Sequence, residues 1–89
     1  MRAVISVIGK DRVGIIAGVT KILAEANINI LDISQTIMQE IFTMMMLVDL
    51  TESCIHFTKL SEDLQHLGAE MGLSIQIQHE DIFNAMHRI

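Results

Sequence analysis

The chain has 89 residues, of which 51% are hydrophobic and only three are aromatic, all phenylalanine, and it carries a net charge of −5. An acidic surface with so few rings for base stacking argues against nucleic acid as a partner, and the charge argues against anionic membranes. A domain of this size buries only about 60–65% of its unfolded surface, so the apolar excess predicts a second buried surface, most simply between subunits.

The N-terminal apolar stretch is too short for a signal-peptide core, and no apolar run approaches the roughly 20 residues of a membrane span. Cys54 is the only cysteine, which excludes an intrachain disulfide and fits a reducing compartment. We therefore expect a cytoplasmic protein with no membrane partner.

The first half of the chain predicts a strand, a helix and a second strand. Residues 2–8 are rich in β-branched side chains, which is typical of a strand. Residues 13–26 carry apolar side chains at helical spacing, and Asn27 suits the left-handed conformation that ends many helices. Residues 28–38 form a predicted strand whose apolar positions change parity, which indicates a bulge or a strand contacted on both faces.

The second half predicts a strand, a helix and a strand. A hairpin turn at residues 39–41 leads into a strand at 42–50 that is apolar on both faces. A helix follows at 57–71 and ends at Gly72. The last strand, at 73–78, alternates apolar and polar residues, so one of its faces is polar.

This order of elements predicts an α+β fold, the ferredoxin-like βαββαβ sandwich, with a four-stranded antiparallel sheet and two helices on one face. The domain should span residues 1–80, and the open face of its sheet needs another cover. Residues 81–89 predict a short C-terminal helix that is ordered and packs on the open sheet face or on a neighbouring subunit. Its apolar stripe consists of Ile82, Phe83, Met86 and Ile89.

The most informative segment joins the first strand to the first helix and reads Gly9-Lys10-Asp11-Arg12-Val13-Gly14-Ile15-Ile16. Gly9 is expected to let the strand break sharply, and Gly14, in the first helical turn, to keep the surface bare. The first N–H groups of a helix lack partners and carry partial positive charge, so a bare helix start can bind a carboxylate or phosphate. Replacing Gly14 with valine should then block binding and leave the fold largely intact. The alternative is that Gly14 only permits close packing of helix on sheet.

The same segment resembles the Asp-Arg-Pro-Gly-Leu-Leu turn of ACT domains, and Asn27-Ile28-Asn29-Ile30 resembles the Gly-Ile-Asn-Ile that opens their second strand. The predicted hairpin and closing strand extend the match over nearly all of residues 1–80. With its tail, the chain looks like the stand-alone ACT-domain proteins of bacteria and archaea. Val13 stands where the family usually has proline. Valine keeps the backbone N–H that proline lacks, and no ring fixes its φ, so the conformation of the turn is less restricted.

The resemblance implies a regulatory module, without catalytic activity or cofactor, that binds an amino acid or a similar small carboxylate. In this family the ligand commonly lies at a dimer interface, between the first turn of one subunit and the second strand of the other. We therefore expect a homodimer or a dimer of dimers, with a possible unidentified protein partner. The site residues that the resemblance implies are Asp11, Arg12, Val13, Gly14 and Ile15 at the helix start, and Asn29, Ile30 and Leu31 on the strand.

Two other classes of function stay open. The chain could be a ligand-independent assembly module for a metabolic enzyme, marked by dimers that need no ligand and by a co-purifying partner. It could also be an acylphosphatase-like hydrolase, because those enzymes share this fold and use an arginine in the region that Arg12 occupies. They also need an asparagine between the second and third strands, where this chain offers only Gln35 and Gln39.

The histidines and the cysteine predict no site of their own. His79-Glu80-Asp81 is the best local cluster for a metal, but no spacing matches a recognised zinc or iron site. Cys54 and His56 lie two apart in a predicted loop without an orienting third group, so we expect a free thiol rather than a nucleophile.

Overall fold

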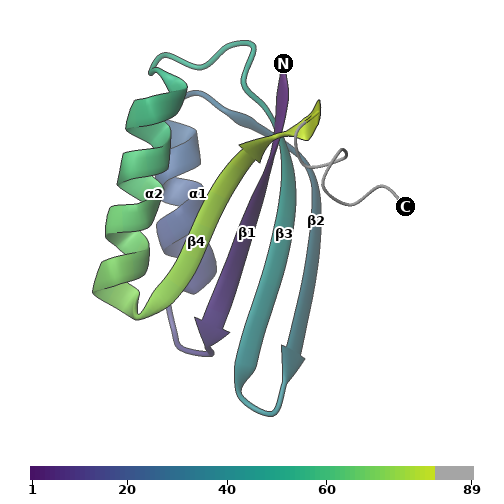
Figure 1. Ribbon diagram of the computed structural model, residues 1–89, viewed down its shortest axis with the longest axis vertical. Coiled ribbons are helices and arrows are strands. Elements are labelled where there is room, and N and C mark those ends of the chain that lie inside the picture. The colour runs from purple at the N-terminus through teal and green to yellow at the C-terminus, as the bar shows by residue number, and fades with distance from the viewer. Residues whose placement is uncertain (82–89) are drawn as a thin grey trace.

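A computed structural model of the protein describes residues 1–81. Its elements are β1 (Arg2–Lys10), α1 (Ile15–Glu25), β2 (Asn29–Met38), β3 (Ile41–Asp49), α2 (Phe57–Met71) and β4 (Leu73–His79). The strands form one antiparallel sheet in the order β2-β3-β1-β4, and both helices cover the same face of it (Figure 1). The predicted ferredoxin-like α+β fold is confirmed.

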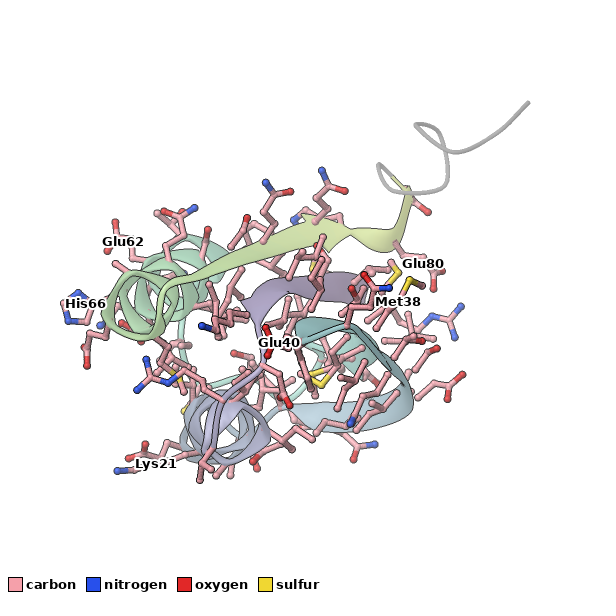
Figure 2. All side chains as sticks on the ribbon, turned by 90° about the horizontal axis from the view of Figure 1, so that it is seen from below. Lys21, Met38, Glu40, Glu62, His66 and Glu80 are labelled. Atoms are coloured by element: carbon pink, nitrogen blue, oxygen red, sulfur yellow. The ribbon has the colours of Figure 1, made fainter. Side chains whose placement is uncertain are left out.

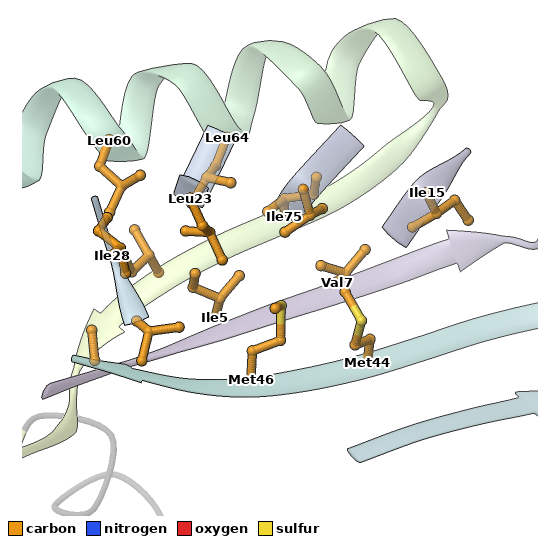
Figure 3. Packing of buried hydrophobic residues seen from close by; sticks show 14 of the residues in the cluster. Ile5, Val7, Ile15, Leu23, Ile28, Met44, Met46, Leu60, Leu64 and Ile75 are labelled. Carbon is orange, nitrogen blue, oxygen red and sulfur yellow. The ribbon is translucent and has the colours of Figure 1, made fainter. Parts of the chain in front are cut away.

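The hydrophobic core fills the space between the sheet and the helices (Figure 3). β1, β3 and β4 alternate buried and more exposed positions, because neighbouring side chains of a strand point to opposite faces. The helices close the core with apolar residues one turn apart, Val19 and Leu23 on α1 and Leu60 and Leu64 on α2. Burial of each such side chain contributes about 1.5–3 kcal/mol, which makes this single layer the main source of stability.

Three turns confirm local predictions. Asn27 follows α1 with a φ of 59°, the left-handed conformation that asparagine tolerates at a helix end. Gln39 and Glu40 form the hairpin turn with φ of 48° and 76°, and two positive φ values define the type I′ turn that matches the twist of paired strands. Gly72 ends α2 with a φ of 71°.

β2 contains the predicted irregularity. Its pairing with β3 shifts between Ile30 and Asp32 and leaves Leu31 as the extra residue of a bulge. A one-residue shift moves every later side chain to the other face. Asn29 and Asp32 therefore lie on the same face of the sheet although they are three positions apart.

Two predictions about the glycines of the first turn are wrong. Gly9 does not break the strand, because it lies inside β1 between Phe42 of β3 and Leu73 of β4. A Cβ there would stand 2.5 Å from a Leu73 methyl group, so close approach of β4 is what requires glycine. Gly14 is not in the first helical turn but is the N-cap of α1, with a φ of 95°, and the helix begins at Ile15, two residues later than predicted.

The exposed apolar surface gathers on β2 more than on β3. Met45 and Leu47, on the second face of β3, are half-buried, whereas Leu31, Ile33 and Ile37 on β2 are 43%, 44% and 52% exposed. β2 is also an edge strand, and an edge offers a row of backbone N–H and C=O groups to another chain. β2 thus combines exposed apolar side chains with a free sheet edge.

Figure 2 shows the helix layer and the sheet from below. Lys21 and His66 lie on the helices, and Met38 and Glu80 lie on the side of the sheet that the helices leave open.

The predicted C-terminal helix falls on residues 82–89, which lie outside the described part of the chain. Within residues 1–81, no helix has the length and apolarity to cross a bilayer.

Candidate functional site

The turn between β1 and α1 lies at the lower end of the sheet in Figure 1, near the β2–β3 hairpin. Asp11 donates its N–H to the Glu40 carbonyl at 2.7 Å, which ties the turn to the hairpin. Arg12 donates from Nη1 to the Met71 carbonyl at 3.3 Å, which ties the turn to the end of α2. A cation suits that position because the last carbonyls of a helix carry partial negative charge.

A hollow of about 490 Å³ opens beside this turn and is lined by Lys10, Asp11, Arg12, Met71 and Gly72. This volume lies within the range of small-molecule sites. Two cationic side chains and one carboxylate surround the hollow, so its charge suits a small anion or a zwitterion.

α1 presents its N-terminus at the same turn without a side-chain cap. The first bond of the helix runs from the Gly18 N–H to the Gly14 carbonyl at 2.9 Å, so the three N–H groups that follow Gly14 point toward the helix end. A Cβ on Gly14 would have Met71 Cε, 3.9 Å away, as its nearest neighbour. Helix–sheet packing therefore does not explain this glycine, whereas its φ of 95° does.

The strand half of the predicted site lies at the opposite end of the sheet. β2 begins at the upper end of Figure 1 and runs down to the hairpin, and its ten residues span about 33 Å. One chain therefore does not bring Asn29, Ile30 and Leu31 to the turn after β1. A second copy of the chain would be needed to supply them.

Residues 2–78 match the family model described as "ACT domain". The chain belongs to the ACT domain family. It is 62% identical over 89 residues to a UPF0237 protein of Clostridium acetobutylicum, covering 100% of both chains. It is 56% identical over 88 residues to a UPF0237 protein of the archaeon Methanocaldococcus jannaschii, covering 99% of this chain and 98% of that one.

Solved structures agree with this assignment. An ACT domain protein from Streptococcus pneumoniae has a TM-score of 0.80 and 44% identity over 98% of each chain. The ligand-free regulatory subunit of aspartate kinase from Thermus thermophilus has a TM-score of 0.66 and 28% identity over 86% of this chain and 50% of that one. ACT domains are typically regulatory, and the second of these structures is of that kind.

The predicted site residues of this ACT domain differ in what they offer. Val13 is 96% exposed at the tip of the turn, whereas Ile15 is only 2% exposed, so Ile15 can contribute its backbone N–H but not its side chain. On β2, Asn29 is exposed, Ile30 is half-buried and Leu31 is exposed at the bulge. A ligand at the strand half would thus meet one amide and one apolar side chain.

Met71 and Gly72 also line the hollow of this ACT domain, although neither is among the site residues predicted from the sequence. The signal for them lies in the topology rather than in a motif. β4 pairs antiparallel with β1 and places Leu73 opposite Gly9, so the end of α2 must lie beside the turn that follows β1.

Within residues 1–81, neither Cys54 nor any histidine lines the hollow beside Arg12. Among residues 1–81, no group of three His, Cys, Asp or Glu side chains comes together as a metal site requires. His79 stacks on Phe57, with ring centroids 4.2 Å apart. Cys54 is exposed, and its Sγ lies 3.5 Å from the Glu25 carbonyl.

Asp49 is a charged group beside the strand half of the site, opposite Asn29 in the β2–β3 pair. The Thr51 hydroxyl and the Thr51 N–H both donate to its carboxylate, at 2.6 and 2.9 Å, and hold the pKa of Asp49 below its usual value. Because the folded-state pKa is lowered, the carboxylate keeps its charge at neutral pH and loses it only as the pH falls through that lowered value.

Proposed function

We propose that this ACT domain is a non-catalytic regulatory module that binds a small carboxylate-bearing metabolite, an amino acid, between two copies of the chain. Residues 11–15 of one copy supply the helix-start half of the site, and residues 29–31 of the other copy supply the strand half. The observation that carries the proposal is a bare helix start beside a 490 Å³ hollow, with the strand half at the far end of the same chain.

Antiparallel pairing of β2 with β2 of a second copy would produce this arrangement. Such pairing sets the start of one strand beside the end of the other. The end of β2 leads into the hairpin whose Glu40 carbonyl accepts the Asp11 N–H, so the start of the second copy's β2 would come near the turn. The pairing would also bury Ile33 and Ile37 and cover the exposed edge.

The chemistry of the two halves suits an amino acid. The N–H groups after Gly14, at the positive end of the α1 dipole, attract the ligand carboxylate. Asp11 on one side and Asp49 beside Asn29 on the other attract the α-ammonium. The Asn29 amide can both donate and accept, so it can hold either group.

The first test is the oligomeric state. We expect light scattering at micromolar concentration to give the mass of a dimer or a dimer of dimers, because a specific interface buries about 800 Å² per subunit. Ile33→Lys places a charge on the edge of β2 and should shift the protein toward monomer. Gln76→Lys places the same charge on an exposed position of β4, at the other edge of the sheet, and should not. A monomeric wild-type protein would contradict the proposal.

The second test is ligand binding. A thermal-shift screen of the twenty amino acids and common metabolites should find a compound that raises the melting temperature, because a ligand that binds only the folded state stabilises it. Asn29→Ala should then weaken the affinity for that compound by about 1–3 kcal/mol in calorimetry, the cost of leaving a buried polar group unpaired. Gln76→Ala, on the opposite edge strand, is the matched control. Equal affinities for wild type and Asn29→Ala would place the site elsewhere.

The exposed apolar β2 also favours a second candidate, a ligand-independent assembly module for a metabolic enzyme. Stable dimers that respond to no compound in the screen, together with a co-purifying enzyme, would support it. The hydrolase alternative is tested by an acyl-phosphate hydrolysis assay. We expect no turnover, because the Arg12 guanidinium donates to the end of α2 and the chain offers no matching asparagine.

A further inference from the structure

The open face of the sheet carries a second hollow, separate from the proposed ligand site. Its volume is about 210 Å³, and it is lined by the apolar residues Val4, Met45, Met46 and Leu47 and by the polar residues Asp32 and Ser34. Val4 and Asp32 flank Leu47 on the neighbouring strands, and Ser34 lies opposite Met45. These side chains therefore share the face that α1 and α2 leave open.

The described part of the chain ends at this same face. β4 ends at His79, and the next residue, Glu80, forms an ion pair with Arg2 at 2.7 Å. Arg2 precedes Val4 by two positions on β1, so their side chains point to the same side of the sheet. Figure 2 shows Glu80 on the side away from the helices. The ion pair thus fixes the point from which residues 82–89 continue.

The length and composition of that segment fit the hollow. Arg2 and Val4 are about 7 Å apart along the strand, and Met45 pairs two positions further on. Eight residues span about 12 Å as a helix and about 27 Å when extended, so the segment reaches the hollow in either form. Its apolar side chains are Ile82, Phe83, Met86 and Ile89.

Charge also matches between the segment and the face. Residues 82–89 contain Arg88 and His87 and no acidic side chain. Asp32 is exposed on β2 beside the hollow. A cation that follows the apolar residues of the segment can therefore meet a carboxylate at the edge of the apolar surface.

We propose that residues 82–89 bind the open sheet face of their own chain, with Phe83 in the hollow formed by Val4, Met45 and Leu47 and with Arg88 facing Asp32. The Arg2–Glu80 ion pair holds the segment beside this face, and such tethering gives an effective concentration in the millimolar range. Binding within one chain is therefore favoured over binding to another. The open face is then closed to a second copy, which leaves the β2 edge for self-association.

The experiment uses the full-length protein with ¹³C-labelled methionine methyl groups observed by NMR. Met45 lies on the open face, whereas Met44 is buried on the helix side of the same strand and does not line the hollow. Phe83→Ala removes an aromatic ring, and with it the ring-current shift of any methyl group in contact. We expect the Met45 resonance to move while that of Met44 stays in place and reports an intact core. The matched control, Phe57→Leu, removes a ring on the helix side and should leave Met45 unchanged.

Each outcome decides the proposal. A Met45 shift of the same size in the wild-type background and in the Ile33→Lys background, once light scattering shows the latter to be monomeric, supports binding within the chain. A shift that is absent from the monomeric Ile33→Lys protein would assign the segment to a neighbouring copy and overturn it. No shift at Met45, with the core resonances intact, would also overturn it. None of these outcomes depends on ligand binding, so the proposed function is tested separately.

Discussion

Replacing Gly68 with alanine is expected to lower the free energy of unfolding by about 1–3 kcal/mol, the usual cost of overpacking a close-packed contact. A Cβ on Gly68 would stand 2.7 Å from the Leu73 carbonyl oxygen and 3.3 Å from Ile75 Cγ1. The first neighbour is backbone of β4, so it cannot rotate away, and α2 must move off the sheet. Helix propensity acts in the opposite direction, because alanine is favoured over glycine by about 1 kcal/mol inside a helix.

The two effects are separated by a matched substitution. Gly18→Ala makes the same change inside α1, where the added Cβ would meet the two methyl groups of Leu67 at 3.2 and 3.3 Å. Those methyl groups end a flexible side chain that can shift, so we expect a change of less than about 1 kcal/mol in either direction. Urea unfolding of both variants against wild type measures the difference. A Gly68→Ala protein as stable as Gly18→Ala would show that α2 and β4 are not in the close contact described above.

Replacing Gly14 with valine is expected to abolish ligand binding and also to destabilise the fold. The sequence alone predicts the first effect with the fold largely intact. The second effect follows from the φ of 95° at Gly14, because a β-branched residue in the left-handed region costs about 1–3 kcal/mol. Space is not the reason, since a Cβ there would have its nearest neighbour at 3.9 Å.

Loss of binding through added bulk must be distinguished from loss through lower stability. Gly14→Asn adds a side chain at the helix start, but asparagine tolerates positive φ, so most of the stability should remain. Val19→Ala lowers stability by a cavity in the buried face of α1 and adds nothing near the hollow. For the compound that the thermal-shift screen identifies, affinity should fall about tenfold or more for both Gly14 variants. It should stay at the wild-type value for folded Val19→Ala, and the reverse pattern would exclude the helix start as the site.

The sequence predicted the local structure of this protein because local structure depends on neighbouring residues. Hydrophobic periodicity separates α1 and α2 from the strands, and α2 was predicted with the bounds that the structure has. Asn27 and Gly72 mark the helix ends through their tolerance of positive φ. The parity change in β2 corresponds to the bulge at Leu31. The resemblance to ACT domains also rests on short runs of adjacent residues. The match of the family model to residues 2–78 confirms it.

Tertiary structure decided the features that depend on residues distant in sequence. Gly9 has the local appearance of a strand breaker, but its role comes from Leu73, which the register of β4 brings against it. The hollow beside Arg12 exists because the end of α2 lies next to the turn after β1. Asn29 lies the length of β2 away from that turn, because β2 starts at the opposite end of the sheet and runs toward the hairpin. No local pattern encodes these distances, because they are set by strand register and by which strands pair.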